Sequence, residues 1–204
     1  MTSLEEVARA VAGCVACPLA KTRLKTVPGE GPAAADILFI GEAPGYHENQ
    51  QGRPFVGPAG QLLDELLASI GQKRSDVFIA NVVKCRPPSN RDPQPDEIAA
   101  CSEYLDAQIA IIKPRVIVTL GRYSMARFFP GESISKIHGV ARQRGGITCF
   151  AMYHPAAALH QPALRQTLFR DMAKLPEIVA KAKAADAPAE PPAPPDKPEQ
   201  LSLF

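Results

Sequence analysis

The chain has 204 residues, of which 46% are hydrophobic and 22% charged, and its formal net charge is +2. This length fits one domain with a tail, and the apolar content favours a packed core over a disordered chain. The sequence has no apolar run near ~18 residues and does not begin with a charged-then-apolar segment, so we expect neither a membrane span nor a secretory signal. These features predict a cytoplasmic protein.

The charge is divided unevenly along the chain. Residues 184–204 carry a net charge of −3, whereas the preceding 183 residues carry 22 basic and 17 acidic side chains, a net of +5. A modestly basic body permits binding to nucleic acid but does not identify it.

Hydrophobic periodicity predicts short apolar strands that alternate with amphipathic helices. This alternation is typical of a parallel sheet covered by helices on both faces, so we expect an α/β fold. In chain order we predict a helix at Leu4–Val15, a strand at Asp36–Ile40, a helix at Gln61–Ile70, a strand at Val77–Val83, a helix at Asp96–Ile112, a strand at Val116–Leu120, a helix at Arg122–Phe129, a strand at Ile147–Met152 and a helix at Leu164–Lys181.

Three polar loops, 41–60, 84–95 and 153–162, follow predicted strands and are expected at one edge of the sheet. The first reads GEAPGYHENQQGRPFVGPAG and combines two carboxylates with an aromatic side chain, five glycines and three prolines. Open α/β sheets bind ligands at the carboxyl ends of their strands, and a connection much longer than about 4–6 residues is usually functional or disordered. The sequence therefore predicts a ligand site at this edge.

Four cysteines have spacings that favour a metal site: Cys14 and Cys17 form a CxxC pair, and Cys85 and Cys101 lie farther along the chain. The absence of a predicted secretory signal argues against disulfides. Four thiolates fit either zinc or an iron–sulfur cluster, and the lack of a second close CxxC favours a cluster of structural role. Cys149 lies within a predicted strand, where a free cysteine packs as a small apolar residue.

Four motifs together resemble the family 4 uracil-DNA glycosylases: CVAC, GEAPGYHENQQGRPFVGPAGQLL, NVVKCRPPSNRDPQPDEIAAC and YHPAAAL. The resemblance covers roughly residues 4–178 and implies a three-layer α/β/α sandwich with a central four-stranded parallel sheet. It also implies one 4Fe–4S cluster on Cys14, Cys17, Cys85 and Cys101, and hydrolytic removal of uracil from DNA that leaves an abasic site and starts base excision repair.

The resemblance implies a pocket for uracil extruded from the duplex, formed by Gly41, Glu42, Ala43, Phe55, Asn81 and His154. Phe55 would stack on the base. The Asn81 amide can accept from N3–H and donate to O4, a pattern that cytosine reverses at its 4-position. His154 would stabilise the negative charge that develops on O2. The other three histidines, His47, His138 and His160, are interpreted as ordinary loop and surface residues.

The attacking water requires a carboxylate, for which Glu42 and Glu48 are the two candidates. Position in the motif favours Glu48, whereas Glu42 is expected to line the pocket through its backbone. Asn49 departs from the aspartate that often follows this glutamate, and Asn90 is expected to orient the water or the carboxylate.

Contacts to DNA phosphates are expected from Lys84, Arg86 and Arg91, whose loop lies at the same sheet edge. Leu159 is the candidate for an apolar wedge that enters the duplex as the base leaves, with a core position as the alternative.

The sequence predicts three segments: a domain at 1–180, a Pro/Ala-rich disordered linker at 181–199, and a peptide at 200–204. The last five residues, QLSLF, resemble the pentapeptide with which bacterial repair proteins bind the sliding clamp. In that interpretation Gln200, Leu201, Leu203 and Phe204 contact the clamp, and the protein is a monomer located at the nucleoid.

Two other hypotheses remain open. A redox protein or sensor built around the cluster would show a reversible redox couple and release no base. A catalytically weak binder of uracil-containing DNA would bind tightly and also release no base.

Overall fold

A computed structural model describes residues 1–185; the 200–204 peptide and most of the predicted linker lie outside these residues. The helices and strands in chain order are α1 (Leu4–Gly13), η1 (Pro18–Lys21), β1 (Ile37–Gly41), α2 (Tyr46–Gln51), α3 (Pro58–Ser69), η2 (Arg74–Asp76), β2 (Phe78–Asn81), η3 (Pro88–Asn90), α4 (Pro95–Ile112), β3 (Val116–Leu120), α5 (Arg122–Phe128), α6 (Ile134–Ile137), β4 (Ala141–Arg144), β5 (Ile147–Met152), α7 (Pro155–His160), α8 (Ala163–Met172) and α9 (Leu175–Ala185).

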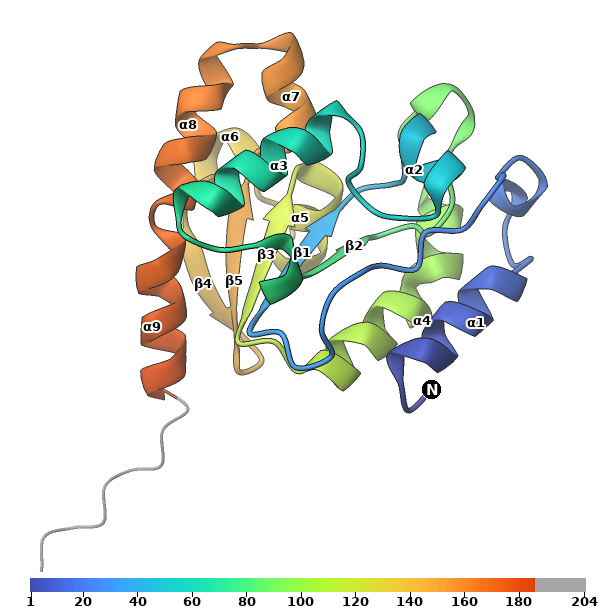
Figure 1. The fold of residues 1–204 in the computed structure, drawn as a ribbon, viewed down its shortest axis with the longest axis horizontal. Helices are drawn as coiled ribbons and strands as arrows, with labels where there is room; N and C mark the ends of the chain where they lie inside the picture. Colours follow the sequence, from blue (N-terminus) through green and yellow to red (C-terminus); the bar gives the residue numbers. More distant parts are fainter. Residues whose placement is uncertain (186–204) are drawn as a thin grey trace, which may run out of the picture.

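The centre of the fold is a twisted sheet with strand order β2-β1-β3-β5-β4, flanked by helices (Figure 1). The strands β2, β1, β3 and β5 are parallel, as predicted. The fifth strand, β4, is antiparallel to β5 and was not expected, because all four of its side chains are exposed and carry no apolar alternation. The α/β/α class is confirmed, with five strands in place of four.

Alternate residues of each parallel strand enter two separate hydrophobic layers, because successive side chains of a strand point to opposite faces. On β1, Leu38 and Ile40 pack in the layer beneath α1, α4 and α5. Ile37 and Phe39 pack in the opposite layer, beneath α3, α8 and α9. The fold therefore has three layers, and because the four strands are parallel their carboxyl ends lie at one edge of the sheet.

Several predicted elements have different bounds in the structure, and one predicted helix is divided in two. The predicted helix at Leu164–Lys181 is two helices, α8 and α9, preceded by the short α7. Pro176 is the second residue of α9, where a missing N–H is tolerated, but the same residue would have interrupted a continuous helix.

None of the helices within residues 1–185 is both long and apolar enough to cross a membrane.

The segment before β1 covers the outer side of β2. Glu30 forms an isolated antiparallel bridge with Ile79, in which the Glu30 N–H donates to the Ile79 carbonyl at 2.9 Å and the reverse bond measures 2.8 Å. Nearby, the Val27 N–H donates to the Lys84 carbonyl at 2.8 Å. This segment thus occupies backbone groups that an edge strand would otherwise leave unpaired.

Candidate functional site

A pocket of about 650 Å³ opens at the carboxyl ends of the parallel strands. The loops after β1, β2, β3 and β5 all contribute to its wall, as the parallel topology requires. It brings together residues predicted from three separate motifs: Glu42, Ala43, Glu48, Phe55, Asn81, Asn90, Arg91 and His154.

Gly41 lies directly behind the pocket wall. In the parallel register it is paired with Asn81 on the neighbouring strand. A Cβ atom at Gly41 would lie 2.4 Å from Oδ1 of Asn81 and 2.6 Å from Cζ of Phe55. The glycine therefore lets an amide and an aromatic ring approach the same strand end.

The Asn81 side chain is the clearest indication of a ligand. Asn81 is 1% exposed, and its Oδ1 is buried without a hydrogen-bond partner among residues 1–185. A buried acceptor left unpaired costs about 1–3 kcal/mol, so buried polar groups are normally satisfied. Because Asn81 lines the pocket, a ligand N–H is a suitable partner for this oxygen.

His154 is held as a neutral imidazole. It precedes α7 as its N-cap residue, and its Nδ1 accepts a hydrogen bond from the Ala156 N–H at 3.1 Å. Burial lowers the pKa of His154 to about 4, although the negative charge of Glu48 opposes that shift. With Nδ1 acting as acceptor, the single ring proton is on Nε2, which becomes the available donor.

The ring of His154 stacks on Phe55, with 5.5 Å between ring centroids and 25° between their planes. Phe55 has a positive φ of 52°, which is unusual for a bulky side chain. The main chain is therefore bent at the residue that supplies the aromatic wall of the pocket.

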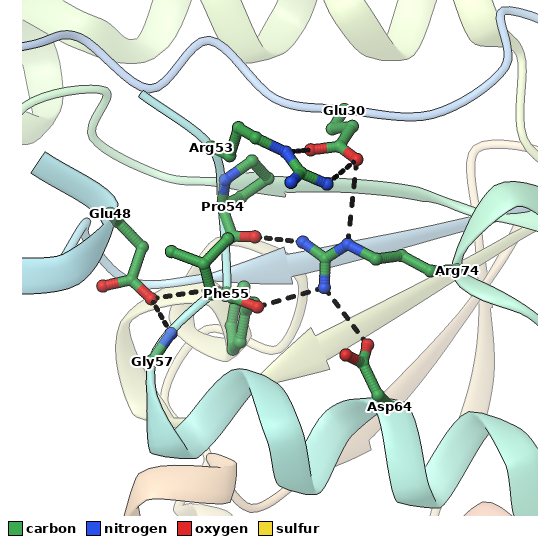
Figure 2. A network of polar contacts seen from close by, with 9 residues as sticks. Glu30, Glu48, Arg53, Pro54, Phe55, Gly57, Asp64 and Arg74 are labelled. Atoms are coloured by element: carbon green, nitrogen blue, oxygen red, sulfur yellow. Dashed lines mark hydrogen bonds and ion pairs between the residues drawn. The ribbon is translucent and has the colours of Figure 1, made fainter. Parts of the chain in front are cut away.

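Glu48 lies on α2, a short helix within a segment that was predicted to be a loop. Its Oε1 accepts from the N–H groups of Val56 and Gly57, both at 2.9 Å, and its Oε2 accepts from the Gly45 N–H at 3.1 Å. Figure 2 shows the carboxylate directed at the backbone beyond Phe55. Three backbone donors fix its orientation at the pocket wall.

Glu42 is the second carboxylate of the pocket, and its environment differs. Burial, with a smaller effect of Asp92, raises the pKa of Glu42 to about 7, and Arg122 opposes the shift. Arg122 also forms an ion pair with Asp92. Arg122 and Asp92 were not among the predicted site residues. Arg122 lies two residues after the end of β3, where the other parallel strands also place pocket residues.

The predicted DNA-contacting residues divide into two groups. Arg86 packs over the Tyr46 ring at 5.3 Å and donates from Nε to Oδ1 of Asn90 at 2.7 Å. Arg91 pairs with Glu97 through two short bonds of 2.9 and 2.6 Å. Leu159, on α7, is 48% exposed and so does not occupy the core position that was its alternative. These three side chains lie at or near the surface around the pocket.

Lys84 forms the other group, and its predicted phosphate contact is wrong. It is 1% exposed, and its Nζ donates to the Asn81 carbonyl at 2.8 Å and to Oε1 of Gln108 at 2.7 Å. The side chain turns inward because these two acceptors satisfy its charge beneath β2. Lys84 supports the backbone of a pocket residue instead of reaching solvent.

The four cysteines of the predicted metal site line one small cavity beside α1 and α4. Nη1 of Arg23 lies 3.4 Å from the Cys85 sulfur, and the Lys84 N–H lies 3.3 Å from the Cys101 sulfur. In residues 1–185 no group of three or more His, Cys, Asp or Glu side chains is placed to hold a single metal ion. Cys149 is buried in the core on β5, as predicted.

Comparisons with known proteins agree with this geometry. Residues 28–175 match the family model described as the uracil DNA glycosylase superfamily. The chain is 50% identical over 193 residues to a type-4 uracil-DNA glycosylase of Sulfurisphaera tokodaii, covering 90% of this chain and 88% of that protein. It is 45% identical to type-4 uracil-DNA glycosylases of Archaeoglobus fulgidus, covering 89% of this chain and 96% of the relative, and of Thermotoga maritima, covering 87% and 95%.

Proposed function

The chain belongs to the uracil-DNA glycosylase superfamily, in its type-4 group, and we propose that it removes uracil from DNA with the residues of the pocket described above. Water adds to C1′ of the deoxyribose while the bond to N1 of uracil breaks, giving free uracil and an abasic site. The observation that carries this assignment is the unpaired Oδ1 of Asn81, a residue that lines the pocket together with Phe55 and His154.

Recognition of uracil rests on the two ends of the Asn81 amide. The unpaired Oδ1 accepts from N3–H, and the amide NH₂ donates to O4. Cytosine has no N3–H and presents a donor at its 4-position, so both contacts would be lost. Each unpaired buried group costs about 1–3 kcal/mol, which is enough to reject the wrong base.

His154 supports departure of the base. When the N-glycosidic bond breaks, negative charge collects on the uracil O2, and the Nε2–H of a neutral imidazole can donate to it. The contact from the Ala156 N–H to Nδ1 keeps the proton on Nε2, and the low pKa keeps the ring neutral at physiological pH. The donor is therefore oriented before the substrate enters.

Glu48 positions the attacking water. Its Oε2 accepts only one of the three backbone bonds, from Gly45, and so keeps acceptor capacity for a water at the pocket wall. Its negative charge also favours the oxocarbenium-like sugar that forms as the base leaves. Asn90, which lines the same pocket, is held by Arg86 on the side from which DNA would approach.

Binding of the DNA strand is assigned to three side chains around the pocket: the half-buried Arg86 and Arg91 and the exposed Leu159. Arg86 and Arg91 would contact phosphates, which position the strand without reading its sequence. Leu159 would enter the space that the extruded base leaves, a role that its exposure on α7 permits.

The four cysteines are assigned to a 4Fe–4S cluster. Their fit rests on the donor set: four thiols line one cavity, and Arg23 and the Lys84 N–H donate to two of the sulfurs, as donors to ligating thiolates commonly do. When bound, the cluster supplies a structural cross-link between the end of α1, the loop after β2 and α4. The protein residues of the pocket carry out the hydrolysis.

Residues 200–204 are assigned to a sliding clamp on the basis of their sequence, since they lie outside the described residues. Leu203 and Phe204 would enter an apolar groove of the clamp, and Gln200 would bind at its rim. Removal of these five residues should abolish capture by the clamp and leave uracil release from a short oligonucleotide unchanged. A truncated protein that no longer releases uracil, or that the clamp still captures, would contradict a tethering role.

The function is tested by incubating the metal-loaded protein with an oligonucleotide that contains one uracil and measuring free uracil by chromatography. A matched oligonucleotide with cytosine at the same site is the control. We expect release of uracil only, and strongly reduced release by Asn81→Ala and Glu48→Ala at a temperature where circular dichroism shows both variants folded. Folded wild-type protein that releases no uracil would refute the proposal and favour a DNA-binding or redox role.

A further inference from the structure

The main chain at Phe55 must be held in an unfavourable conformation for the ring to face the pocket. Its φ of 52° lies in the left-handed region, which aromatic residues rarely adopt. The turn is also tightly packed, because a Cβ atom at Gly60 would lie 1.8 Å from the Phe55 carbonyl oxygen. A conformation of this kind persists only where surrounding contacts enforce it.

Arg74 supplies one set of these contacts (Figure 2). It comes from η2, and its guanidinium donates from Nη1 to the Phe55 carbonyl at 3.0 Å and from Nη2 to the Pro54 carbonyl. Two carboxylates hold the guanidinium itself: Asp64 of α3 at 3.2 Å and Glu30 at 3.8 Å. The Arg74 side chain is 20% exposed and its bonds to the two carbonyls are partly buried, whereas Asp64 and Glu30 lie on the solvent side, 51% and 36% exposed.

Glu48 supplies the opposing contacts. Oε1 of Glu48 accepts from the Val56 N–H, which belongs to the same peptide unit as the Phe55 carbonyl. A cation therefore holds the oxygen of this peptide and an anion holds its hydrogen. Charge-assisted bonds at both ends of one peptide fix its plane, and that plane determines where the Phe55 ring lies.

We propose that Arg74 is a positioning residue for uracil: it fixes the Phe55 peptide so that the ring presents its face to the base. Arg74 does not line the pocket and acts only through Phe55. This inference rests on the proposed function, because it presupposes that Phe55 stacks on uracil.

The test compares Arg74→Met with Arg53→Met. Arg53 is a matched control, because it also pairs with Glu30, at 2.7 Å, but its side chain bonds to neither carbonyl of the turn. We expect Arg74→Met to weaken inhibition by free uracil and to lower kcat/KM by about tenfold to a hundredfold, the range that a displaced contact of about 1 Å can produce. The kcat/KM of Arg53→Met and its inhibition by free uracil should both stay within about twofold of wild type.

A second variant and a second background make the test decisive. Arg74→Lys keeps the charge for Glu30 and Asp64 but loses the fork that spans two carbonyls, so it should fold and show an intermediate defect. In a Phe55→Leu background, Arg74→Met should add little further loss, because two residues that act through one contact are not additive.

Equal effects of the Arg74 and Arg53 variants would overturn the proposal, as would a full additional loss in the Phe55→Leu background. Wild-type protein that releases no uracil would instead refute the proposed function, so the two failures are distinguishable. If Arg74→Met does not fold, Arg74→Lys carries the same comparison.

Discussion

Gly41→Ala tests whether the close approach of Asn81 and Phe55 is necessary for function. The added Cβ would lie 2.4 Å from Oδ1 of Asn81 and 2.6 Å from Cζ of Phe55, where ordinary contacts begin at 3.4 Å. Because β1 is paired with β2 on one side and β3 on the other, its backbone cannot retreat. The amide and the ring must each move by roughly 1 Å, which can cost about a hundredfold in activity.

The same overlap affects stability. Forcing an extra methyl group into a packed core costs about 1–3 kcal/mol, and in a chain of this size each kcal/mol lowers Tm by about 2–4 °C. Gly13→Ala is the control, since a Cβ atom there has no neighbour within 4 Å. Alanine at that helical position should leave Tm unchanged or raise it slightly.

The assay is single-turnover release of uracil, at a temperature where melting curves show each variant to be folded. We expect Gly41→Ala to lose about a hundredfold in rate and to discriminate less between uracil and cytosine, whereas Gly13→Ala keeps both properties. A folded Gly41→Ala protein with the wild-type rate and discrimination would refute the reasoning that the positions of Asn81 and Phe55 define the site.

Four further predictions concern two titrating groups, the buried lysine and the cysteines. The pKa of Glu42 is about 7 in the folded protein, above the ordinary value of 4.5, so wild-type stability should fall as pH rises from 4.5 to 7; Glu42→Gln should melt higher than wild type at pH 8, with the difference vanishing near pH 4.5. Because the pKa of His154 is about 4, protonation of His154 should not lower kcat/KM between pH 7 and pH 5. If kcat/KM instead falls below pH 7 in the wild type but not in Glu42→Gln, Glu42 and not Glu48 positions the water. Lys84→Met should slow uracil release and cost about 1–3 kcal/mol of stability, because it leaves two buried acceptors unpaired. The salt dependence of binding to uracil-free DNA should stay unchanged. If the slope of log K against log salt concentration instead falls by about one, Lys84 contacts a phosphate. Cys85→Ser should lower the iron content and the visible absorption of the purified protein, and unchanged values for both would contradict the assigned ligand set.

The sequence predicted the elements whose side chains are apolar on both faces. The bounds of β3 and β5 agree with the predicted ones, because a strand that is buried on both faces has a nearly continuous run of apolar residues, which is visible in the sequence. The sequence did not predict β4, whose residues Ala141–Arg144 are all exposed, or α2, which is six residues long and mostly polar. These elements are stabilised by their neighbours rather than by a periodic pattern.

At the site, motif position placed seven predicted side chains and Ala43 around one pocket, but it did not give the direction in which long side chains turn. Lys84 and Arg74 are cationic, and charged side chains are expected at the surface. Both turn inward: Lys84 donates to the Asn81 carbonyl and the Gln108 amide, and Arg74 donates to the Phe55 carbonyl and pairs with Asp64. The contacts from Arg74 to Phe55 and from Lys84 to Gln108 join residues that lie 19 and 24 positions apart, and no local pattern encodes them.

The two edges of the sheet have a consequence for self-association. Exposed strand edges promote pairing between copies of a protein, and charged side chains or covering segments suppress it. At one edge, β4 carries the exposed Arg144 and the exposed Arg142, which pairs with Glu132 at 2.8 Å, and charged side chains on an edge strand disfavour pairing with a second copy. At the other edge, the bridge between Glu30 and Ile79 already occupies backbone groups of β2. Both edges of the sheet are therefore protected against strand pairing between copies, which disfavours aggregation when many copies bind close together on one DNA molecule.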